Sequence, residues 1–445
     1  MIEKKKEDIL KNQDSAEQFI FCKAACGRFE KDKKKQKIIC SKALKETFIN
    51  IPVGDDIIKY FLSDFNSEKF CAVAVKANYD DTKDDDYQCV ETAKIIDKIS
   101  EEKNGVWGLI EPAVFGIIFE NKKEQQIEYN VNLVKESLEK TANKKVFAGA
   151  ASFPTSDYNK EDIIKNALKA LDHAILTDKR TALFNSVTLN ISGDKYYEQN
   201  NIKKAKEEFK AALKLVPSDL NILNSLGVCY AIRNDYLKAH QLFKKITEKS
   251  LNHQMAAYNI GMANLMLNKK EDALKHFLIL YNQNEDYLFE SGFQIAKIYI
   301  EDKNFKKAKP YIDTIIRLKP EKSVCHRLAG NYYAGLEDID NAINSYKKAV
   351  KYNPYDAASL SALGYLFDKK GENIEIAISF CKESAVNFPE NGLYRYRLGK
   401  LYFKNKMLNK AFDEFIAASN AGYDSSEYIN IIKKELNITP IKITA

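Results

Sequence analysis

The chain has 445 residues, and its hydrophobic fraction of 45% with a charged fraction of 29% is typical of folded domains and excludes a wholly disordered chain. The formal net charge of +7 is small for this length and the lysines are spread along the sequence, so we expect no nucleic-acid partner. No stretch approaches the roughly 18 apolar residues of a membrane span, and the first residues lack the apolar core of a signal peptide. We therefore expect no membrane association and a cytoplasmic location.

The spacing of cysteine and histidine gives no indication of metal or nucleophile chemistry. The eight cysteines contain no CxxC pair, and the five histidines are dispersed. We expect reduced thiols that replace apolar core residues, no metal site, no cofactor and no catalytic arrangement of Ser/His/Asp or Cys/His.

The first part of the chain predicts a Lys-rich helical leader over residues 1–50 and then an α+β domain over 51–185. The apolar run FCAVAV begins the pattern of this domain. We expect strands at 70–75, 106–110, 114–119, 145–151 and 181–186, and helices at 89–100, 123–140 and 160–176. The order βαββαβ with a trailing strand predicts a ferredoxin-like arrangement, in which helices cover a sheet that contains antiparallel strands.

The end of this domain, VFAGAASFPTSDYNKEDIIKNALKALDHAILTDKRTALF, resembles the end of a GGDEF (diguanylate cyclase) domain. The positions that match are Gly149, Pro154, Ala167, Ala170, Leu171, Ala174 and Phe184. Upstream, GVWGLIEPAVFGIIFE takes the place of the family's signature hairpin. The resemblance covers about residues 55–185 and implies a GGDEF-like fold and a place in bacterial signal transduction.

The same resemblance implies that catalysis has been lost. Active members condense two GTP molecules and need carboxylates that hold Mg²⁺ against the phosphates. The five signature positions here are Glu111, Pro112, Ala113, Val114 and Phe115, and the first strand, FCAVAVKAN, contains no Asp or Glu. We expect a pseudoenzyme that acts as a regulatory or dimerisation module. In the second case the protein forms a homodimer through this domain. Three alternatives remain open: a cation site in the acidic loop 80–86, a nucleotide-binding or cyclase-type enzyme with unconventional ligands, and a sensory or dimerisation module unrelated to GGDEF.

The second part of the chain is a repeat. A small residue recurs every 34 or 35 residues, and a series of alanines recurs with the same period. The first series is Gly193, Gly227, Gly261, Ala296, Gly330, Gly364 and Gly399, and the second series is Ala205, Ala239, Ala273, Ala308, Ala342, Ala377 and Ala411. A period of this length predicts stacked units of two helices, with the small residues where the helices cross closely.

The pattern of small residues, aromatics and unit-ending prolines resembles the tetratricopeptide repeat (TPR) family over 186–425, in seven units. It implies an all-α superhelix, closed by a capping helix and tail over 426–445. One extra residue before Glu290 and another after Gly371 predict local irregularities. The link at 186–192 has no flexible spacer, and this predicts a fixed angle between the two parts.

In that family the first helix of each unit lines a groove that takes peptides or helices. Aromatic, amide and basic side chains at the corresponding positions suit a peptide. These positions are Asn221, Asn224, Tyr258, Met262, Phe293, Lys297, Arg327, Asn331, Tyr365, Tyr396, Lys400 and Phe403. The family's basic clamp for carboxylates is matched only by Arg327 with Asn331. The predicted function is a non-catalytic adaptor or scaffold whose partner is a protein or peptide.

Overall fold

The computed structural model describes residues 42–48, 50–65, 67–77, 85–120, 126–142, 145–250 and 253–436. Two compact units divide between Ala256 and Ala257. Most of the predicted leader, residues 80–84 of the acidic loop and the tail 437–445 lie outside the described residues. Helix α2 (Lys42–Thr47) is the described part of the leader.

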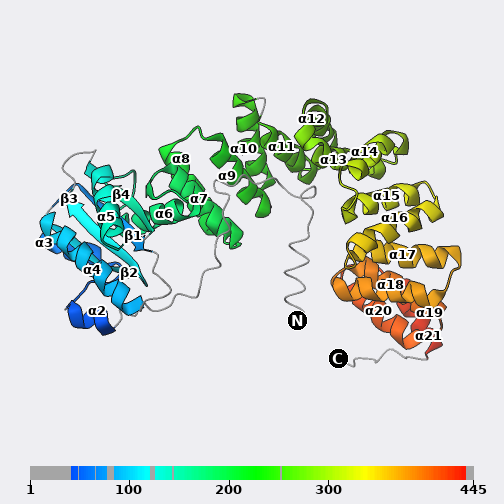
Figure 1. The fold of residues 1–445 in the computed structure, drawn as a ribbon. Coiled ribbons are helices and arrows are strands. Elements are labelled where there is room, and N and C mark those ends of the chain that lie inside the picture. Colours follow the sequence, from blue (N-terminus) through cyan, green and yellow to red (C-terminus); the bar gives the residue numbers. More distant parts are fainter. Residues whose placement is uncertain are drawn as a thin grey trace, which may run out of the picture. The chain divides into compact units, whose positions relative to one another are not determined.

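The first unit contains a five-stranded sheet (Figure 1). Its strands are β1 (Phe70–Ala77), β2 (Gly105–Glu111), β3 (Val114–Glu120), β4 (Val146–Phe153) and β5 (Thr181–Leu183). The order across the sheet is β2-β3-β1-β4-β5, with β1 antiparallel to both β3 and β4 and with β5 parallel to β4. Helices α4 (Asp85–Glu102), α5 (Gln126–Ala142) and α6 (Ile163–Leu176) connect the strands. Along the chain this is βαββαβ followed by one more helix and strand.

Helices cover both faces of the sheet. Side chains from alternate positions of β1 enter a core with α2, α4 and α5, and the others enter a second core with α3 (Asp56–Asp64) and α6. Because both faces are covered, the central strand is apolar at every position from Phe70 to Val75. A Cβ at Gly149 of β4 would lie 1.9 Å from the backbone nitrogen of Leu171, so only glycine lets α6 pack this closely on the sheet.

The repeat half consists of helical hairpins, as its period predicts. Each hairpin pairs one helix with the next along the described chain. The pairs are α7 (Ser186–Glu198) with α8 (Ile202–Leu215), α9 (Leu220–Ile232) with α10 (Tyr236–Lys249), α11 (Gln254–Met266) with α12 (Lys270–Gln283), α13 (Leu288–Glu301) with α14 (Phe305–Leu318), α15 (Ser323–Gly335) with α16 (Ile339–Tyr352), α17 (Ala357–Lys370) with α18 (Ile374–Asn387), and α19 (Gly392–Lys404) with α20 (Leu408–Asn420). Helix α21 (Ser426–Glu435) packs against α20 where the sequence predicts a cap.

In five of the seven hairpins the repeat glycine lies under an aromatic ring of the same hairpin, and in the sixth hairpin Gly364 lies against Sγ of Cys381 instead. A Cβ at Gly227 would come within 2.5 Å of the Phe243 ring, and a Cβ at Gly330 within 2.5 Å of the Tyr346 ring. The fourth hairpin has Ala296 at the repeat-glycine position, and there the smaller Ile312 replaces the ring. Glycine is therefore required where a ring packs on it.

The turn inside each hairpin contains one residue in the left-handed backbone region. These residues are Asn200, Asn234, Asn268, Lys303, Glu337, Gly371 and Lys406, with φ between 55° and 75°.

The two sites of predicted irregularity also depart locally from the regular hairpin. A 3₁₀ turn (Glu285–Tyr287) precedes α13, and α17 continues to Lys370 before Gly371 ends it.

The sheet runs almost directly into the first hairpin. The side chain of Asn185 caps α7 by accepting backbone N–H hydrogen bonds, one of them from Thr188 at 3.1 Å. The Thr188 hydroxyl lies 3.0 Å from Nδ1 of His173 on α6, and burial lowers the pKa of that imidazole. Lys169 of α6 forms an ion pair with Glu208 of α8 at 2.7 Å. The sheet and the first two hairpins thus share one compact unit, and residue 185 lies inside it.

The described cysteines form no disulfide, and four of the five are buried. Cys71, Cys229, Cys325 and Cys381 lie in apolar surroundings, whereas Cys89 is half-buried. Burial raises the pKa of Cys71 to about 11 and the pKa values of Cys229 and Cys381 to about 12. These three thiols stay protonated at neutral pH and act as small core side chains, as predicted.

The glycine and the ring predict a strong coupling in a double-mutant cycle. Gly227→Ala forces a methyl group into the Phe243 ring and is expected to lower the free energy of unfolding by about 1–3 kcal/mol. Phe243→Ile is expected to cost a similar amount because it leaves a void. The double variant copies the natural Ala296 and Ile312 pair, so its loss should fall short of the sum by about 1 kcal/mol or more. Chemical denaturation followed by circular dichroism measures all three, and strictly additive losses would contradict the coupling.

Candidate binding surface

The predicted groove positions fall into three groups in the structure. The exposed side chains are Asn221, Lys297, Asn331, Tyr365 and Lys400; the half-buried ones are Arg327, Tyr396 and Phe403; and the buried ones are Asn224, Tyr258, Met262 and Phe293. The spacing within the repeat locates the first helices correctly, but it does not distinguish surface from core for every residue on them.

The prediction of surface positions is wrong for the four buried residues. Tyr258 is fully buried, its ring centroid lies 5.5 Å from that of Phe277, and its hydroxyl accepts a hydrogen bond from Gln294 at 3.3 Å. Met262 shares that hydrophobic cluster, and Phe293 belongs to the core of the next hairpin. Asn224 is also fully buried. The first helix of a hairpin touches both its own partner helix and the following hairpin, so its buried stripe is wider than that of a surface helix.

Two further predicted positions contact the capping helix. The ring of Tyr396 lies 4.7 Å from that of Tyr423 and 5.9 Å from that of Tyr428, and the ring of Phe403 lies 5.5 Å from that of Tyr428. Both side chains therefore help to hold α21 against the last hairpin. Replacing either one would disturb this contact before it tested any binding role.

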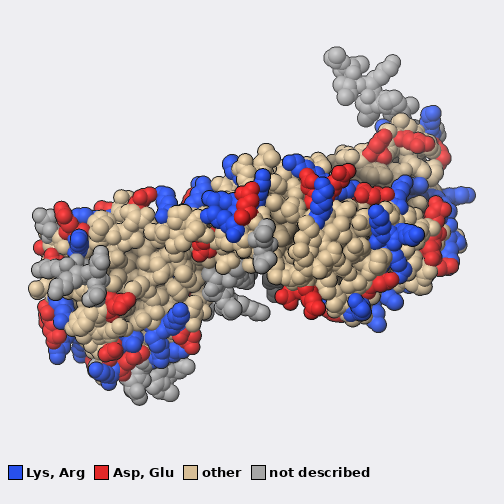
Figure 2. Space-filling view, turned by 90° about the horizontal axis from the view of Figure 1, so that it is seen from above, with Lys and Arg blue, Asp and Glu red and all other residues tan. Residues whose placement is uncertain are grey.

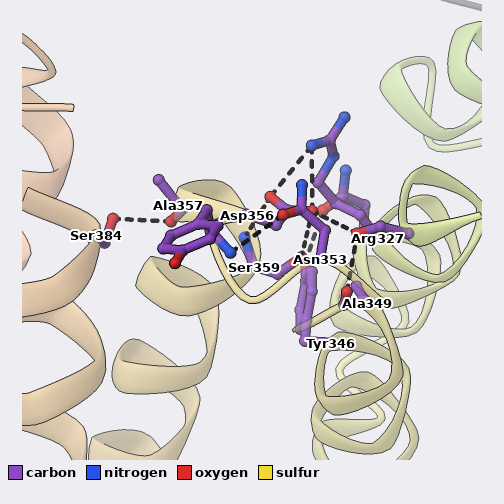
Figure 3. Close-up of polar contacts among 11 residues, drawn as sticks. Arg327, Tyr346, Ala349, Asn353, Asp356, Ala357, Ser359 and Ser384 are labelled. Atoms are coloured by element: carbon purple, nitrogen blue, oxygen red, sulfur yellow. Dashed lines mark hydrogen bonds and ion pairs between the residues drawn. The ribbon is translucent and has the colours of Figure 1, made fainter. Parts of the chain in front are cut away.

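A buried carboxylate organises the polar residues between α15 and α17 (Figure 3). Asp356 immediately precedes α17 and is only 5% exposed. It accepts hydrogen bonds from the backbone N–H of Ser359 (3.2 Å), the hydroxyls of Ser359 (3.2 Å) and Ser323 (3.1 Å), and Nη1 of Arg327 (3.2 and 3.3 Å). Both carboxylate oxygens are satisfied, and a buried carboxylate needs such donors. The contacts fix the Arg327 guanidinium at the edge of the surface, with 23% of its side chain exposed.

Asn331 is also held in place from below. The Tyr346 hydroxyl donates a hydrogen bond of 2.6 Å to Oδ1 of Asn331. Burial raises the pKa of Tyr346 to about 12, although the nearby guanidinium groups of Arg397 and Arg327 oppose the shift. The phenol therefore remains a donor at neutral pH, and the exposed amide keeps one orientation.

A second arginine on this surface does not appear among the predicted groove residues. Arg397 of α19 donates a hydrogen bond of 3.0 Å from Nη1 to the Ser361 hydroxyl, and its guanidinium lies 5.0 Å from the centre of the Tyr365 ring. It follows Tyr396 directly in the sequence, at a position that the repeat pattern does not assign to the groove. The basic side chain of Arg397 was the one feature of the sequence that could have pointed to a binding role. The rotation of α19 against α17 decides whether Tyr396 or Arg397 reaches Tyr365. We refer to Arg327, Asn331, Tyr365, Arg397 and Lys400 as the α15–α19 surface.

Charge elsewhere is mixed, and the described residues contain no cluster suited to a metal. Lys and Arg alternate with Asp and Glu over the face shown in Figure 2. Within the described ranges, no three His, Cys, Asp or Glu side chains come close enough to hold a cation. No helix in that part of the chain is both long and apolar enough to cross a bilayer.

The predicted signature segment forms the hairpin between β2 and β3. Glu111 ends β2 and Val114 begins β3, so Pro112 and Ala113 make the turn, with φ of 59° at Ala113. Glu111 and Pro112 are exposed, Ala113 is half-buried, and Val114 and Phe115 are buried. On β1 the residue paired with Val114 is Lys76, so a cation stands beside the turn.

Comparison with known families identifies the helical hairpins. Two models described as tetratricopeptide repeat match residues 192–250, 290–322 and 323–356. The chain contains tetratricopeptide repeats. The TPR hairpins that these matches cover include α15 and α16, which carry Arg327, Asn331 and Tyr346.

Curated proteins are similar to about half of this chain. Anaphase-promoting complex subunit 3 of Schizosaccharomyces pombe is 23% identical over 207 residues, which are 46% of this chain and 30% of that protein. The TPR repeat-containing protein MJ1428 of Methanocaldococcus jannaschii is 28% identical over 235 residues, which are 48% of this chain and 40% of that protein. The chain thus spans less than half the length of these two relatives.

Solved structures of other proteins align with part of this chain. A tetratricopeptide repeat protein from Parabacteroides merdae is 16% identical, with a TM-score of 0.45, and covers 56% of this chain and 97% of its own. The Cut9–Hcn1 hetero-tetramer of the anaphase-promoting complex contains a chain 13% identical to this one, with a TM-score of 0.49, and the alignment covers 72% of this chain and 61% of that chain.

Removal of the buried carboxylate is expected to destabilise the fifth and sixth hairpins. Asp356→Ala removes one hydrogen-bond acceptor from each of Arg327, Ser323 and Ser359 and deletes a helix cap, for an expected loss of about 2–3 kcal/mol in the free energy of unfolding. Asp340→Ala is the control, because that carboxylate is 75% exposed in an ion pair with Lys370 and should cost less than about 0.5 kcal/mol. Denaturant unfolding measures both; equal small losses would show that the Asp356 contacts do not stabilise the repeats.

Proposed function

We propose that the protein is a non-catalytic scaffold whose TPR half binds a peptide segment of a partner protein at the α15–α19 surface. The observation that carries this proposal is the pair of fixed arginines. Arg327 is held by the buried Asp356, and Arg397 is held by Ser361 and stacked on Tyr365. Guanidinium groups that are already held in place lose little side-chain entropy when they bind a carboxylate.

The other side chains of this surface suit the remainder of a peptide. The exposed amide of Asn331, fixed by Tyr346, offers a donor and an acceptor to a peptide backbone. Tyr365 is 45% exposed and offers an aromatic face of the kind enriched at protein interfaces. Lys400 adds an exposed cation. A cytoplasmic location agrees with the absence of disulfides among the described cysteines.

The relatives point in the same direction. By their printed names, two of them are subunits of the anaphase-promoting complex, from Schizosaccharomyces pombe and Saccharomyces cerevisiae. Those proteins are parts of a multi-protein assembly. We infer from them only the class of function for this chain, which is protein–protein interaction.

The binding role is testable with side chains that do not support the fold. Tyr365→Ala with Lys400→Ala removes exposed groups, so the far-ultraviolet circular dichroism spectrum and the thermal midpoint should be unchanged. Quantitative pull-down from the source cell extract should then lose the same partners that are lost when residues 323–436 are deleted. The matched control is Lys382→Ala, an exposed lysine on the second helix α18. Retention of those partners by the Tyr365 and Lys400 variant would place binding elsewhere.

We further propose that the front domain is a degenerate GGDEF-like module with a regulatory or dimerisation role. Two features support this. The βαββαβ order with strand order β2-β3-β1-β4 suits that fold, and the signature hairpin stands beside the end of β1. The resemblance implies carboxylates at positions 113 and 114 and on β1, but Ala113 and Val114 stand at the first two, and β1 has no Asp or Glu and pairs Lys76 with Val114. A lysine at this edge repels Mg²⁺, so metal-assisted phosphoryl transfer is disfavoured.

Calorimetry with Mg²⁺ and GTP tests the pseudoenzyme proposal. The wild-type chain is expected to give no saturable heat up to about 1 mM GTP, and chromatography should detect no cyclic dinucleotide. A variant with Lys76→Asp and Ala113→Glu, which places carboxylates on β1 and at position 113, controls for the sensitivity of the measurement to cation binding. A micromolar GTP affinity in the wild type would instead favour a nucleotide-binding regulator or enzyme with unconventional ligands.

A further inference from the structure

The second helices of the fourth and fifth hairpins form a pocket that the proposed function does not use. It has a volume of about 530 Å³ and lies between α14 and α16, with α15 beneath it. This volume is within the range of small-ligand sites and many times that of a single water or inorganic ion. It is large enough for an apolar side chain together with the peptide backbone on either side of it.

The pocket has an apolar floor. Ile312 and Ala329 are buried, and Ile316 is half-buried beside them. His326 closes one end, where its Nε2 is 2.7 Å from the carbonyl oxygen of Pro320 and its ring stacks on Tyr352 at 5.4 Å. Since both its ring and Nε2 are engaged, His326 is a structural wall of the pocket.

The rim along α16 is polar and cationic. Asn344, Lys348 and Lys351 are exposed, and they follow one another at intervals that bring them to the same side of the helix. Neither Lys348 nor Lys351 forms an ion pair with another described residue. The one carboxylate that lines the pocket, on Asp313, forms an ion pair with Lys309.

Helices α14 and α16, which line the pocket, carry more positive charge than the next second helix, α18. Helix α14 carries four Lys or Arg side chains and one Asp, and α16 carries three Lys and one Asp. The next second helix, α18, carries one Lys and two Glu. Both helices that line the pocket thus carry a net positive charge, which favours an acidic occupant.

We propose that this pocket binds a short acidic segment of a partner protein, with an apolar side chain on the floor and flanking carboxylates at Lys348 and Lys351. The exposed amide of Asn344 also lines the pocket and can serve the peptide backbone. This site is formed by second helices and is separate from the α15–α19 surface of the first helices. The two sites can therefore hold different parts of one partner or two partners at once.

The test uses fluorescence anisotropy with the full chain and a labelled Glu-Glu-Leu-Glu-Glu peptide at low ionic strength. We expect saturable binding below about 1 mM, and Lys348→Glu with Lys351→Glu should weaken it by about tenfold or more. Lys382→Glu on α18 reverses an equally exposed charge away from the pocket, and it should change the affinity by less than about twofold. No saturable binding, or equal effects of the two reversals, would overturn the proposal.

Further arms separate a built site from general attraction between charges. Asn344→Trp fills the pocket from its exposed rim without changing the charge, and it should weaken binding by about tenfold while leaving the circular dichroism spectrum unchanged. A peptide with glycine in place of leucine should also bind at least about tenfold more weakly. Equal affinity of the two peptides, or full displacement by equimolar inorganic phosphate, would overturn the proposal in favour of a charge-only site. Tyr365→Ala with Lys400→Ala should leave this binding unchanged, so the outcome is independent of the proposed function.

Discussion

The repeat half depends on the contact between a small residue of one helix and a bulky side chain of its partner. Where the partner is an aromatic ring, the small residue is glycine and the ring lies directly against its backbone, as Phe243 does over Gly227. Where it is Ala296, the partner is the smaller Ile312. This contact sets how closely the two helices of a hairpin approach, and that distance in turn decides which side chains face the neighbouring hairpins.

The polar features rest on this apolar framework. Asp356 can be buried at the start of α17 because α15 supplies a guanidinium and a serine hydroxyl at hydrogen-bonding distance. The same carboxylate then caps its own helix through Ser359. One acidic side chain thus joins two hairpins and orients Arg327 at the surface. The arrangement holds the candidate binding groups in place before any partner arrives.

The two candidate binding regions differ in chemistry because they lie on different helices. The α15–α19 surface combines two fixed arginines with a tyrosine and an amide, which suits directional hydrogen bonds. The pocket between α14 and α16 combines an apolar floor with lysines that have no ion-pair partner in the described part of the chain. Lysine gives attraction without a fixed geometry, so the recognition there depends on the apolar side chain. The front sheet adds a third feature, a β2–β3 hairpin at which Lys76 of β1 pairs with Val114.

The sequence by itself determined the repeat, the two-helix unit and the order of strands in the front sheet. These follow from local spacing, since Gly227 and Ala239 recur with the period of the unit and FCAVAV marks a strand covered on both faces. Only the tertiary structure decided which first-helix residues reach the surface. Tyr258 and Phe293 occupy the same repeat position as Arg327 but are buried, because each packs into the core of its own hairpin. Tyr396 is covered by α21, and its neighbour Arg397 reaches Tyr365 instead. Helix rotation and packing between hairpins set these outcomes, and a periodic pattern contains no information about either.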